Sequence, residues 1–128
     1  PAEREEHLRR AAETARLLND HGQLVLLAAQ APAREVRGRM ADVIGAERTV
    51  EIHLHAPDDV RRQRDPSGVH AAVARGDVDG DELRGIAVDY EPPVDPDLVF
   101  DTSETDLAAS VDHVIALLRS RGVLTDGT

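Results

Sequence analysis

The stretch Leu-Val-Leu-Leu-Ala-Ala, residues 24–29, is the feature that most restricts how this chain can fold. It is apolar throughout and lies between Gly22, a residue suited to ending a helix, and Pro32, which breaks regular structure. A short run of this kind is typical of a strand that is buried on both faces of a parallel sheet. No apolar run approaches the roughly 20 residues that a membrane-spanning helix needs. The run therefore predicts an α/β protein without a membrane segment.

Helices are predicted on both sides of this strand. Residues 3–20 carry apolar side chains at helical spacing, namely Leu8, Ala11, Ala12, Ala15 and Leu18. Residues 33–44 carry apolar side chains on one side, namely Val36, Met40, Val43 and Ile44. Each helix therefore has one apolar face to bury.

The alternation continues after residue 44. Residues 49–55 alternate apolar and polar side chains, which predicts a strand, and residues 57–62 are predicted to form a short helix. Residues 64–96 hold most of the glycines and prolines and are interpreted as a long loop, with one helical turn at 69–75. A loop of this length in a compact domain is usually a functional lid or disordered.

The last two elements are a strand at residues 97–101 and a helix at residues 105–121. Thr105 is the predicted N-cap of this helix and Gly122 its predicted stop. The apolar stripe expected to be buried contains Leu107, Val111, Val114 and Leu118.

This order of elements predicts one domain over residues 1–128, with a mainly parallel sheet, flanking helices and right-handed crossovers. Three strands make a small sheet, and the chain opens on a helix with no strand before it. We therefore expect an N-terminal segment to be missing: Pro1 either follows a removed initiator methionine or marks where a longer chain was cut or became ordered. An exposed sheet edge would favour self-association, so a homodimer is one expectation.

Composition excludes several classes of function. The formal net charge of −10 argues against general binding of nucleic acids or anionic membranes, while leaving room for a local basic pocket that binds a small anion. Only Tyr90 and Phe100 are aromatic, so a platform for stacking several bases is not expected. The chain has no cysteine, which excludes thiolate chemistry and fits a cytoplasmic protein.

Four stretches of the chain resemble a known family in their order and spacing. They are residues 3–29, residues 31–34 (Ala-Pro-Ala-Arg), residues 64–78 (beginning Arg-Asp-Pro-Ser-Gly) and residues 89–102. The chain resembles the adenylylsulfate kinases, which phosphorylate the 3′-hydroxyl of adenosine 5′-phosphosulfate (APS). The resemblance implies a P-loop kinase-like α/β fold with a long lid loop over residues 64–96, and nucleotides as small-molecule partners, with ATP and Mg²⁺ as the expected co-substrates.

The resemblance begins in the middle of that family's domain. The family's first strand, its G-x-x-x-x-G-K-[ST] phosphate loop and its DGD-type strand end do not occur in this sequence. The loop's N–H groups hold phosphates and its lysine neutralises charge during transfer, while the DGD-type segment carries the family's catalytic acidic residue. No catalytic residue is therefore assigned, and the chain alone is not expected to transfer phosphate. Either an upstream segment exists or the protein is a degenerate relative.

Two residues near the chain start match substrate-binding positions of the family. Arg4 matches the arginine that helps to hold APS, and a guanidinium can bind phosphate or sulfate through two hydrogen bonds. His7 stands where the family usually has asparagine and can still donate a hydrogen bond. The alternative for Arg4 is a solvated surface arginine, and at least one of Arg9 and Arg10, which match a basic pair, is expected to be surface charge.

Pro32 and Arg34 match the family's strand-end motif Ser-Pro-Phe-Arg and are the other substrate-binding candidates before the loop. Ala31 and Ala33 replace its serine and phenylalanine. Ligands of open α/β sheets lie beyond the carboxyl ends of the strands, so this location suits a binding site.

Arg64, Asp65 and Gly68 match the start of the family's lid and are assigned to the lid and its nucleotide. In the same motif Ser67 replaces the lysine that contacts APS in the family, and His70 replaces a tyrosine.

Leu83 and Gly85 are the last substrate-binding candidates. They stand where the family has a Phe-Thr-Gly segment whose phenyl ring stacks on the APS adenine. Leucine can pack on a base but supplies no aromatic stacking.

Structural roles are expected for the remaining matched or polar positions. Six of them are expected to shape the lid exit and the last strand, namely Tyr90, Glu91, Pro93, Pro96, Asp101 and Thr102. Glu51, His53 and His55 project from one strand face, an arrangement compatible with a transition metal, but ordinary polar strand positions are the preferred interpretation and no metal site is predicted.

Three hypotheses of function follow. The leading one is an adenylylsulfate kinase-like enzyme, provided that a phosphate loop precedes this chain. The second is a catalytically deficient, pseudokinase-like domain that binds a nucleotide or a protein partner. The third is a diverged kinase for another hydroxyl substrate, suggested by the changes at Ser67, His70 and Leu83.

Overall fold

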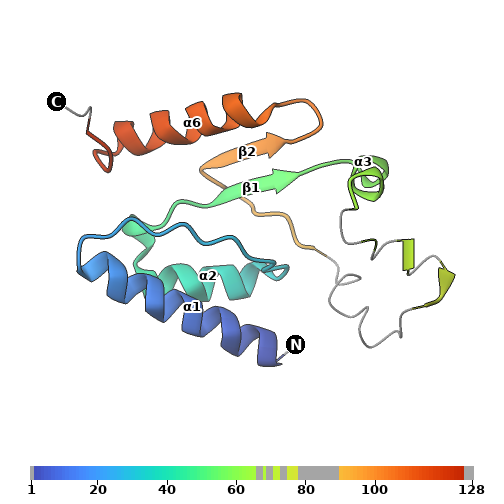
Figure 1. Ribbon diagram of the computed structural model, residues 1–128. Coiled ribbons are helices and arrows are strands. Elements are labelled where there is room, and N and C mark those ends of the chain that lie inside the picture. Colours follow the sequence, from blue (N-terminus) through green and yellow to red (C-terminus); the bar gives the residue numbers. More distant parts are fainter. Residues whose placement is uncertain (1, 66–67, 69–70, 73–74, 78–89, 126–128) are drawn as a thin grey trace. The chain divides into compact units, whose positions relative to one another are not determined.

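The computed structural model describes residues 2–65, 68, 71–72, 75–77 and 90–125. The elements in these ranges (Figure 1) are α1 (Ala2–Asp20), α2 (Arg34–Ile44), the 3-10 turn η1 (Ala46–Arg48), β1 (Ile52–His55), α3 (Asp58–Gln63), β2 (Leu98–Asp101) and α6 (Leu107–Ser120). The chain divides into two compact units, Pro1–Val50 with Ala87–Asp95 and Glu51–Ile86 with Pro96–Thr128. The expectation of one domain over residues 1–128 stays a prediction. Among the helices described, none is both long enough and apolar enough to cross a membrane.

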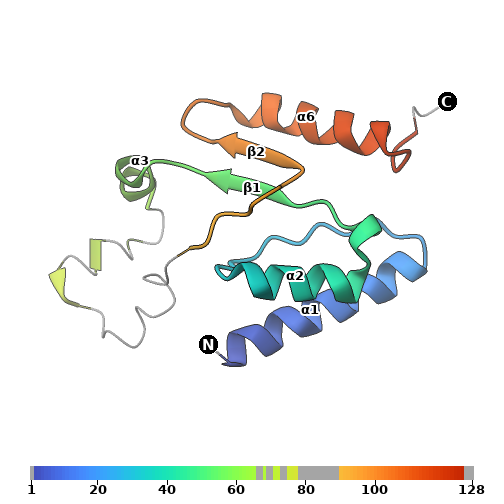
Figure 2. The same cartoon turned by 180° about the vertical axis from the view of Figure 1, so that it is seen from behind.

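The first unit is built on α1 and α2, which lie side by side and run in the same direction (Figures 1 and 2). Residues 21–33 join them by running back along the pair. The apolar positions spaced along both helices meet in one buried cluster, which contains Leu8, Ala12, Ala31, Val36 and Met40. Both helices confirm the sequence prediction, and their core is the one that their apolar spacing indicated.

The end of α1 also follows the prediction. Gly22 has a φ of 78°, a left-handed conformation that glycine adopts without strain. This turn lets the Gln23 N–H donate to the Leu18 carbonyl at 3.0 Å, which satisfies one of the last carbonyls of the helix. Leu18 itself was expected to be buried, but its side chain is 41% exposed.

The apolar run at residues 24–29 is not a strand, so this prediction is wrong. Leu24, Leu26 and Leu27 are 51%, 83% and 45% exposed. A strand exists through hydrogen bonds to a neighbouring strand, and in the described part of the chain no backbone hydrogen bond joins this run to another strand. The described sheet accordingly has two strands where the sequence predicted three.

The second unit contains the parallel pair β1 and β2, with Ile52 opposite Leu98 and Leu54 opposite Phe100. A parallel sheet with flanking helices is the predicted fold class. β2 matches the predicted strand at residues 97–101, whereas β1 begins later than the predicted residue 49. The reason is that Thr49 closes η1: its N–H donates to the Ala46 carbonyl at 3.2 Å instead of to a strand.

α3 and α6 follow the two strands. α3 begins at Asp58, and Pro57 is its N-cap rather than a residue of its first turn. α6 packs on β2, where Phe100 is 6% exposed and its ring centroid lies 5.9 Å from that of His113. Gly122, at a φ of 70°, follows α6 as predicted.

The predicted buried stripe of α6 is only partly correct. Leu118 is buried, but Leu107 and Val111 are 80% and 45% exposed. Two strands of four residues each span roughly 13 Å, whereas a helix of 14 residues is about 21 Å long. The described sheet is too short to cover the whole apolar face of the helix.

The N-cap of α6 is Asp106, not the predicted Thr105. Asp106 Oδ1 accepts a hydrogen bond from the Ala109 N–H at 2.7 Å. We expect Asp106→Ala to lower the free energy of unfolding by about 1 kcal/mol, because a helix N–H loses its acceptor. Thr105→Ala is the matched control and should change it by less than about 0.5 kcal/mol. Urea unfolding followed by circular dichroism measures both, and a larger effect at Thr105 would contradict the assignment.

Candidate functional site

The first group of candidate residues lies at one end of the α1–α2 pair. Because the helices run in the same direction, their N-terminal ends, which carry Arg4, His7 and Arg34, lie at the same end (Figures 1 and 2). Arg4 is half-buried and His7 exposed, and within the described residues neither side chain makes a hydrogen bond or an ion pair. No hydrogen bond among the described side chains joins either of them to Arg34. This end of the pair combines two arginines and the positive ends of two helix dipoles with the acidic first-turn residues Glu3, Glu5 and Glu35.

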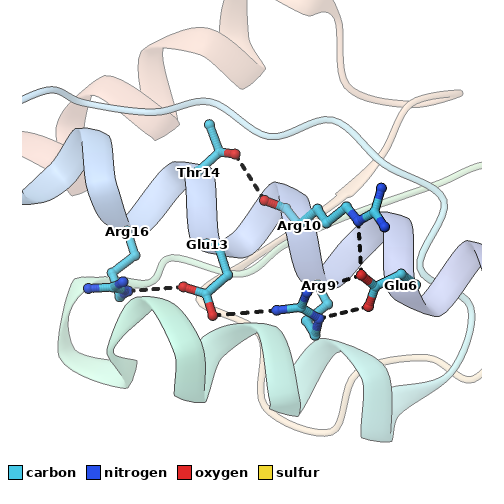
Figure 3. Close-up of polar contacts among 6 residues, drawn as sticks. All are labelled: Glu6, Arg9, Arg10, Glu13, Thr14 and Arg16. Atoms are coloured by element: carbon cyan, nitrogen blue, oxygen red, sulfur yellow. Dashed lines mark hydrogen bonds and ion pairs between the residues drawn. The ribbon is translucent and has the colours of Figure 1, made fainter.

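Arg9 and Arg10 differ from Arg4, because Glu6 binds both of them (Figure 3). The Nε atoms of Arg9 and Arg10 donate to the two carboxylate oxygens of Glu6 at 2.7 and 2.9 Å. These hydrogen bonds, first from Arg9 and then from Arg10, lower the pKa of Glu6 from its ordinary 4.5 to about 2. Glu13 extends the row, at 3.6 Å from Arg9 and 3.3 Å from Arg16. This row is a solvated face of α1 that supports the helix, as expected for at least one of the basic pair.

The lowered pKa of Glu6 makes helix stability depend on pH. The folded-state pKa lies below the unfolded value, so the stabilisation is present above about pH 4.5 and is lost as the pH falls towards 2. We expect a carbon-detected NMR titration to place the Glu6 midpoint near 2 in the wild type. In Arg9→Gln/Arg10→Gln the midpoint should rise towards 4.5, the ordinary value. An unchanged midpoint in the double variant would contradict the assigned cause.

Arg34 is held at the start of α2 by a residue far along the chain. Its N–H donates to Glu91 Oε2 at 2.8 Å, and its Nε lies 3.7 Å from the same oxygen. Glu91 also donates its own N–H to the Pro32 carbonyl at 2.9 Å. The structure therefore brings together Pro32, Arg34 and Glu91, at the place where the strand-end motif was expected to form a site.

Arg37 also holds Pro32 and Glu91 together through hydrogen bonds to their carbonyls. Its Nη1 donates to the carbonyls of Ala31 and Pro32 at 2.6 and 3.1 Å, and its Nη2 donates to the Glu91 carbonyl at 2.6 Å. Its guanidinium lies 5.2 Å from the ring centroid of Tyr90, within the range of a cation–π contact. Sequence reasoning did not single out Arg37. Its spacing from Arg34, one helical turn along α2, was the available signal.

The second group of residues lies beyond the carboxyl ends of β1 and β2 and is part of the second unit. The Thr102 N–H donates to the His55 carbonyl at 2.9 Å. Arg64 donates to Thr102 Oγ1 at 2.8 Å and to the Thr102 carbonyl at 2.7 Å, so the end of α3 is tied to the end of β2. The ends of parallel strands are where ligands of open α/β sheets bind.

Asp101 is the acidic residue of this group. Its Oδ1 accepts hydrogen bonds from the Ser103 hydroxyl at 2.5 Å and the Ser103 N–H at 2.9 Å, and these lower its pKa below the ordinary range. Its Oδ2 lies 3.9 Å from His55 Nδ1. Asp101 is therefore a carboxylate at neutral pH.

The lid candidates are described only in part. The Asp65 side chain accepts a hydrogen bond from the Ala71 N–H at 3.2 Å, and the Gly68 N–H donates to the Asp65 carbonyl at 3.3 Å. Ala71, Ala72 and Arg75 are helical, in agreement with a helical turn at residues 69–75. Of the lid positions compared with the family, five lie outside the described residues, namely Pro66, Ser67, His70, Leu83 and Gly85. The nucleotide-binding roles assigned to lid residues stay predictions.

His53 and His55 lie on one face of β1, with ring centroids 5.4 Å apart. In the part of the chain that the structure describes, no group of three or more His, Cys, Asp or Glu side chains is placed to hold a metal ion.

Known proteins match this chain over most of its length. The family model for adenylylsulphate kinase matches residues 1–101. An adenylyl-sulfate kinase from Shewanella sp. (strain ANA-3) is 37% identical over 123 residues, which are 96% of this chain and 59% of that protein. The bifunctional enzyme CysN/CysC of Rhodopirellula baltica is 34% identical over 122 residues, 95% of this chain and 18% of that protein. This chain thus spans less than two thirds of the length of either relative.

Solved structures agree with the sequence matches. The structure of the Mycobacterium tuberculosis APS kinase CysC in complex with AMPPNP and APS is similar to this chain with a TM-score of 0.78 and 32% sequence identity. The similarity covers 92% of this chain and 68% of that one.

Proposed function

Because this chain belongs to the adenylylsulfate kinase family, we propose that the full-length protein transfers the γ-phosphoryl group of ATP to the 3′-hydroxyl of APS in sulfate activation. The observation that carries the proposal is the position of Arg4 and Arg34 at the shared end of two parallel helices. APS carries a phosphate that is joined to a sulfate, and such anionic groups are bound by guanidinium groups and by helix N-termini.

Each group of described residues has a distinct task in this proposal. Arg4 and Arg34 hold the anionic end of APS, and His7 and Pro32 line the same end of the helix pair. Arg64 ties the start of the lid to the end of β2 through Thr102. Closure of the lid over residues 64–96 would exclude water from the transfer, which suppresses hydrolysis of ATP.

ATP and Mg²⁺ are part of the proposal through the family. In P-loop enzymes the metal neutralises the phosphates of the bound nucleotide. Among the described residues, no group of three or more His, Cys, Asp or Glu side chains is placed to hold a metal ion. The task proposed for these residues is the binding and orientation of the acceptor nucleotide, and no step is assigned to the metal.

A coupled assay of ADP release tests the proposed function. The full-length protein is incubated with ATP, Mg²⁺ and APS, and the blank contains ATP and Mg²⁺ alone. We expect ADP release above the blank, together with an equal amount of 3′-phosphorylated APS. A folded protein that releases no more ADP with APS than without it would overturn the proposal.

Two further expectations stay predictions. The first is a cytoplasmic location, which was inferred from the absence of cysteine. The second is a homodimer, for which sedimentation velocity of the full-length protein is the measurement. A single monomeric species at micromolar concentration would contradict it.

A further inference from the structure

We propose that Glu91 is a positioning residue, which holds the Arg34 guanidinium in the orientation that receives the anionic group of the acceptor. The inference rests on the proposed function and deepens it, because it names a residue that determines how well the same site binds its substrate. Glu91 is separated from Arg34 by 57 residues, so their contact is made by the tertiary structure.

Glu91 is fixed by its backbone before its side chain acts. Its N–H donates to the Pro32 carbonyl at 2.9 Å, and its own carbonyl accepts from Arg37 Nη2 at 2.6 Å. Arg37 is in turn bound to the carbonyls of Ala31 and Pro32. Because both of its peptide groups are hydrogen-bonded, Glu91 places its carboxylate at a defined position beside the N-terminal end of α2.

The carboxylate has two separate tasks. Ala33, the N-cap residue of α2, makes no side-chain cap, and Glu91 Oε2 instead accepts the first N–H of the helix at 2.8 Å. The same oxygen lies 3.7 Å from Arg34 Nε. The guanidinium atom nearest to this carboxylate is Nε, and among the described residues the two Nη nitrogens of Arg34 donate no hydrogen bond. These two Nη nitrogens belong to the planar guanidinium edge that can donate paired hydrogen bonds to a phosphate or sulfate group.

The Arg34 guanidinium stays accessible to an anion beside this carboxylate. The pairing with Glu91 favours ligand binding, because an arginine that is already oriented loses less conformational entropy when its ligand binds. The side chains of Arg34 and Glu91 are 52% and 49% exposed, so a ligand has access to them.

The two tasks can be separated by substitution in the full-length protein. Glu91→Gln keeps a carbonyl oxygen that can accept the Arg34 N–H but removes the ion pair, whereas Glu91→Ala removes both. We expect Glu91→Gln to leave the melting temperature within about 1 °C of the wild type and to raise the KM for APS about threefold to tenfold, with kcat little changed. Glu91→Ala should raise KM at least as much and also lower the melting temperature.

Glu35→Gln is the matched control, because it removes one negative charge from the same first turn of α2. The Glu35 carboxylate is 83% exposed and pairs only loosely with Arg39, at 3.8 Å. Its substitution should leave the KM for APS unchanged. A purely structural role for Glu91 predicts that Glu91→Gln behaves like this control, and that result would overturn the inference. Tighter APS binding in Glu91→Gln would also overturn it, because the carboxylate would then compete with the ligand.

The inference can fail separately from the proposed function. If the wild type neither turns over nor binds APS, the proposed function fails, and calorimetry with inorganic pyrophosphate tests the positioning role alone. We expect Glu91→Gln to bind pyrophosphate about threefold to tenfold more weakly than the wild type, the same ratio as for APS, and Glu35→Gln to bind it equally well. This result would support an oriented Arg34 that binds another phosphate ligand. Equal binding in the two variants, or no binding of pyrophosphate by the wild type, would overturn it.

Discussion

Replacing Arg34 by alanine is expected to raise the KM for APS about 10-fold to 100-fold, because a hydrogen bond between charged groups contributes about 1.5–3 kcal/mol. The loss should appear mainly in KM, since the guanidinium binds an anionic group that does not react in the phosphoryl transfer. Steady-state kinetics with varied APS at saturating ATP measure it. The KM for ATP should change much less than the KM for APS.

Two variants serve as controls for this prediction. Arg39→Ala removes a positive charge from the same helix, where Arg39 pairs with Glu5 and Glu35, and should leave the KM for APS within about twofold of the wild type. Arg34→Lys keeps the charge but loses the planar fork, and should recover only part of the affinity. Equal effects of Arg34→Ala and Arg39→Ala would show that only the overall charge matters.

Phe100→Ala is expected to lower the free energy of unfolding by about 3–5 kcal/mol, the largest effect on stability in this chain. The side chain is 6% exposed between the sheet and α6, so its loss removes buried apolar surface and leaves a cavity. Urea unfolding of the full-length protein, followed by circular dichroism, is the measurement.

The matched control is Leu107→Ala on α6. The sequence assigns Leu107 to the buried stripe, whereas the structure leaves it 80% exposed, and we expect a change of less than about 0.5 kcal/mol. A change of 2 kcal/mol or more, roughly the loss for a buried leucine, would mean that another part of the protein covers this residue.

Helices were easier to predict from this sequence than strands. α1 and α2 lie where apolar side chains recur at helical spacing, because a helix satisfies its backbone hydrogen bonds within its own segment. Strand prediction succeeded for β1 and β2, which pair with each other. It failed at residues 24–29, where the composition is the most apolar but no strand of the described chain supplies backbone partners.

The sequence identified several residues of the candidate site but not the contacts between them. Motif positions pointed to Arg4, Pro32 and Arg34, because their types and spacing survive in the sequence. The contact between Arg34 and Glu91 spans 57 residues and depends on how the segment that contains Glu91 returns to α2, which no local pattern encodes. Arg37 was missed for the same reason, since its carbonyl partners are known only from the folded chain.

The sequence by itself determined the helices, the parallel sheet class and the family resemblance, because these depend on periodicity and on residue types at fixed spacing. Only the tertiary structure decided which arginines are available to an anion. Glu6 binds Arg9 and Arg10 one turn away on the same helix, whereas Glu91, 57 residues further along the chain, contacts Arg34. The physical reason is that the availability of a charge is set by its neighbours in space, and most of those neighbours are distant in the chain.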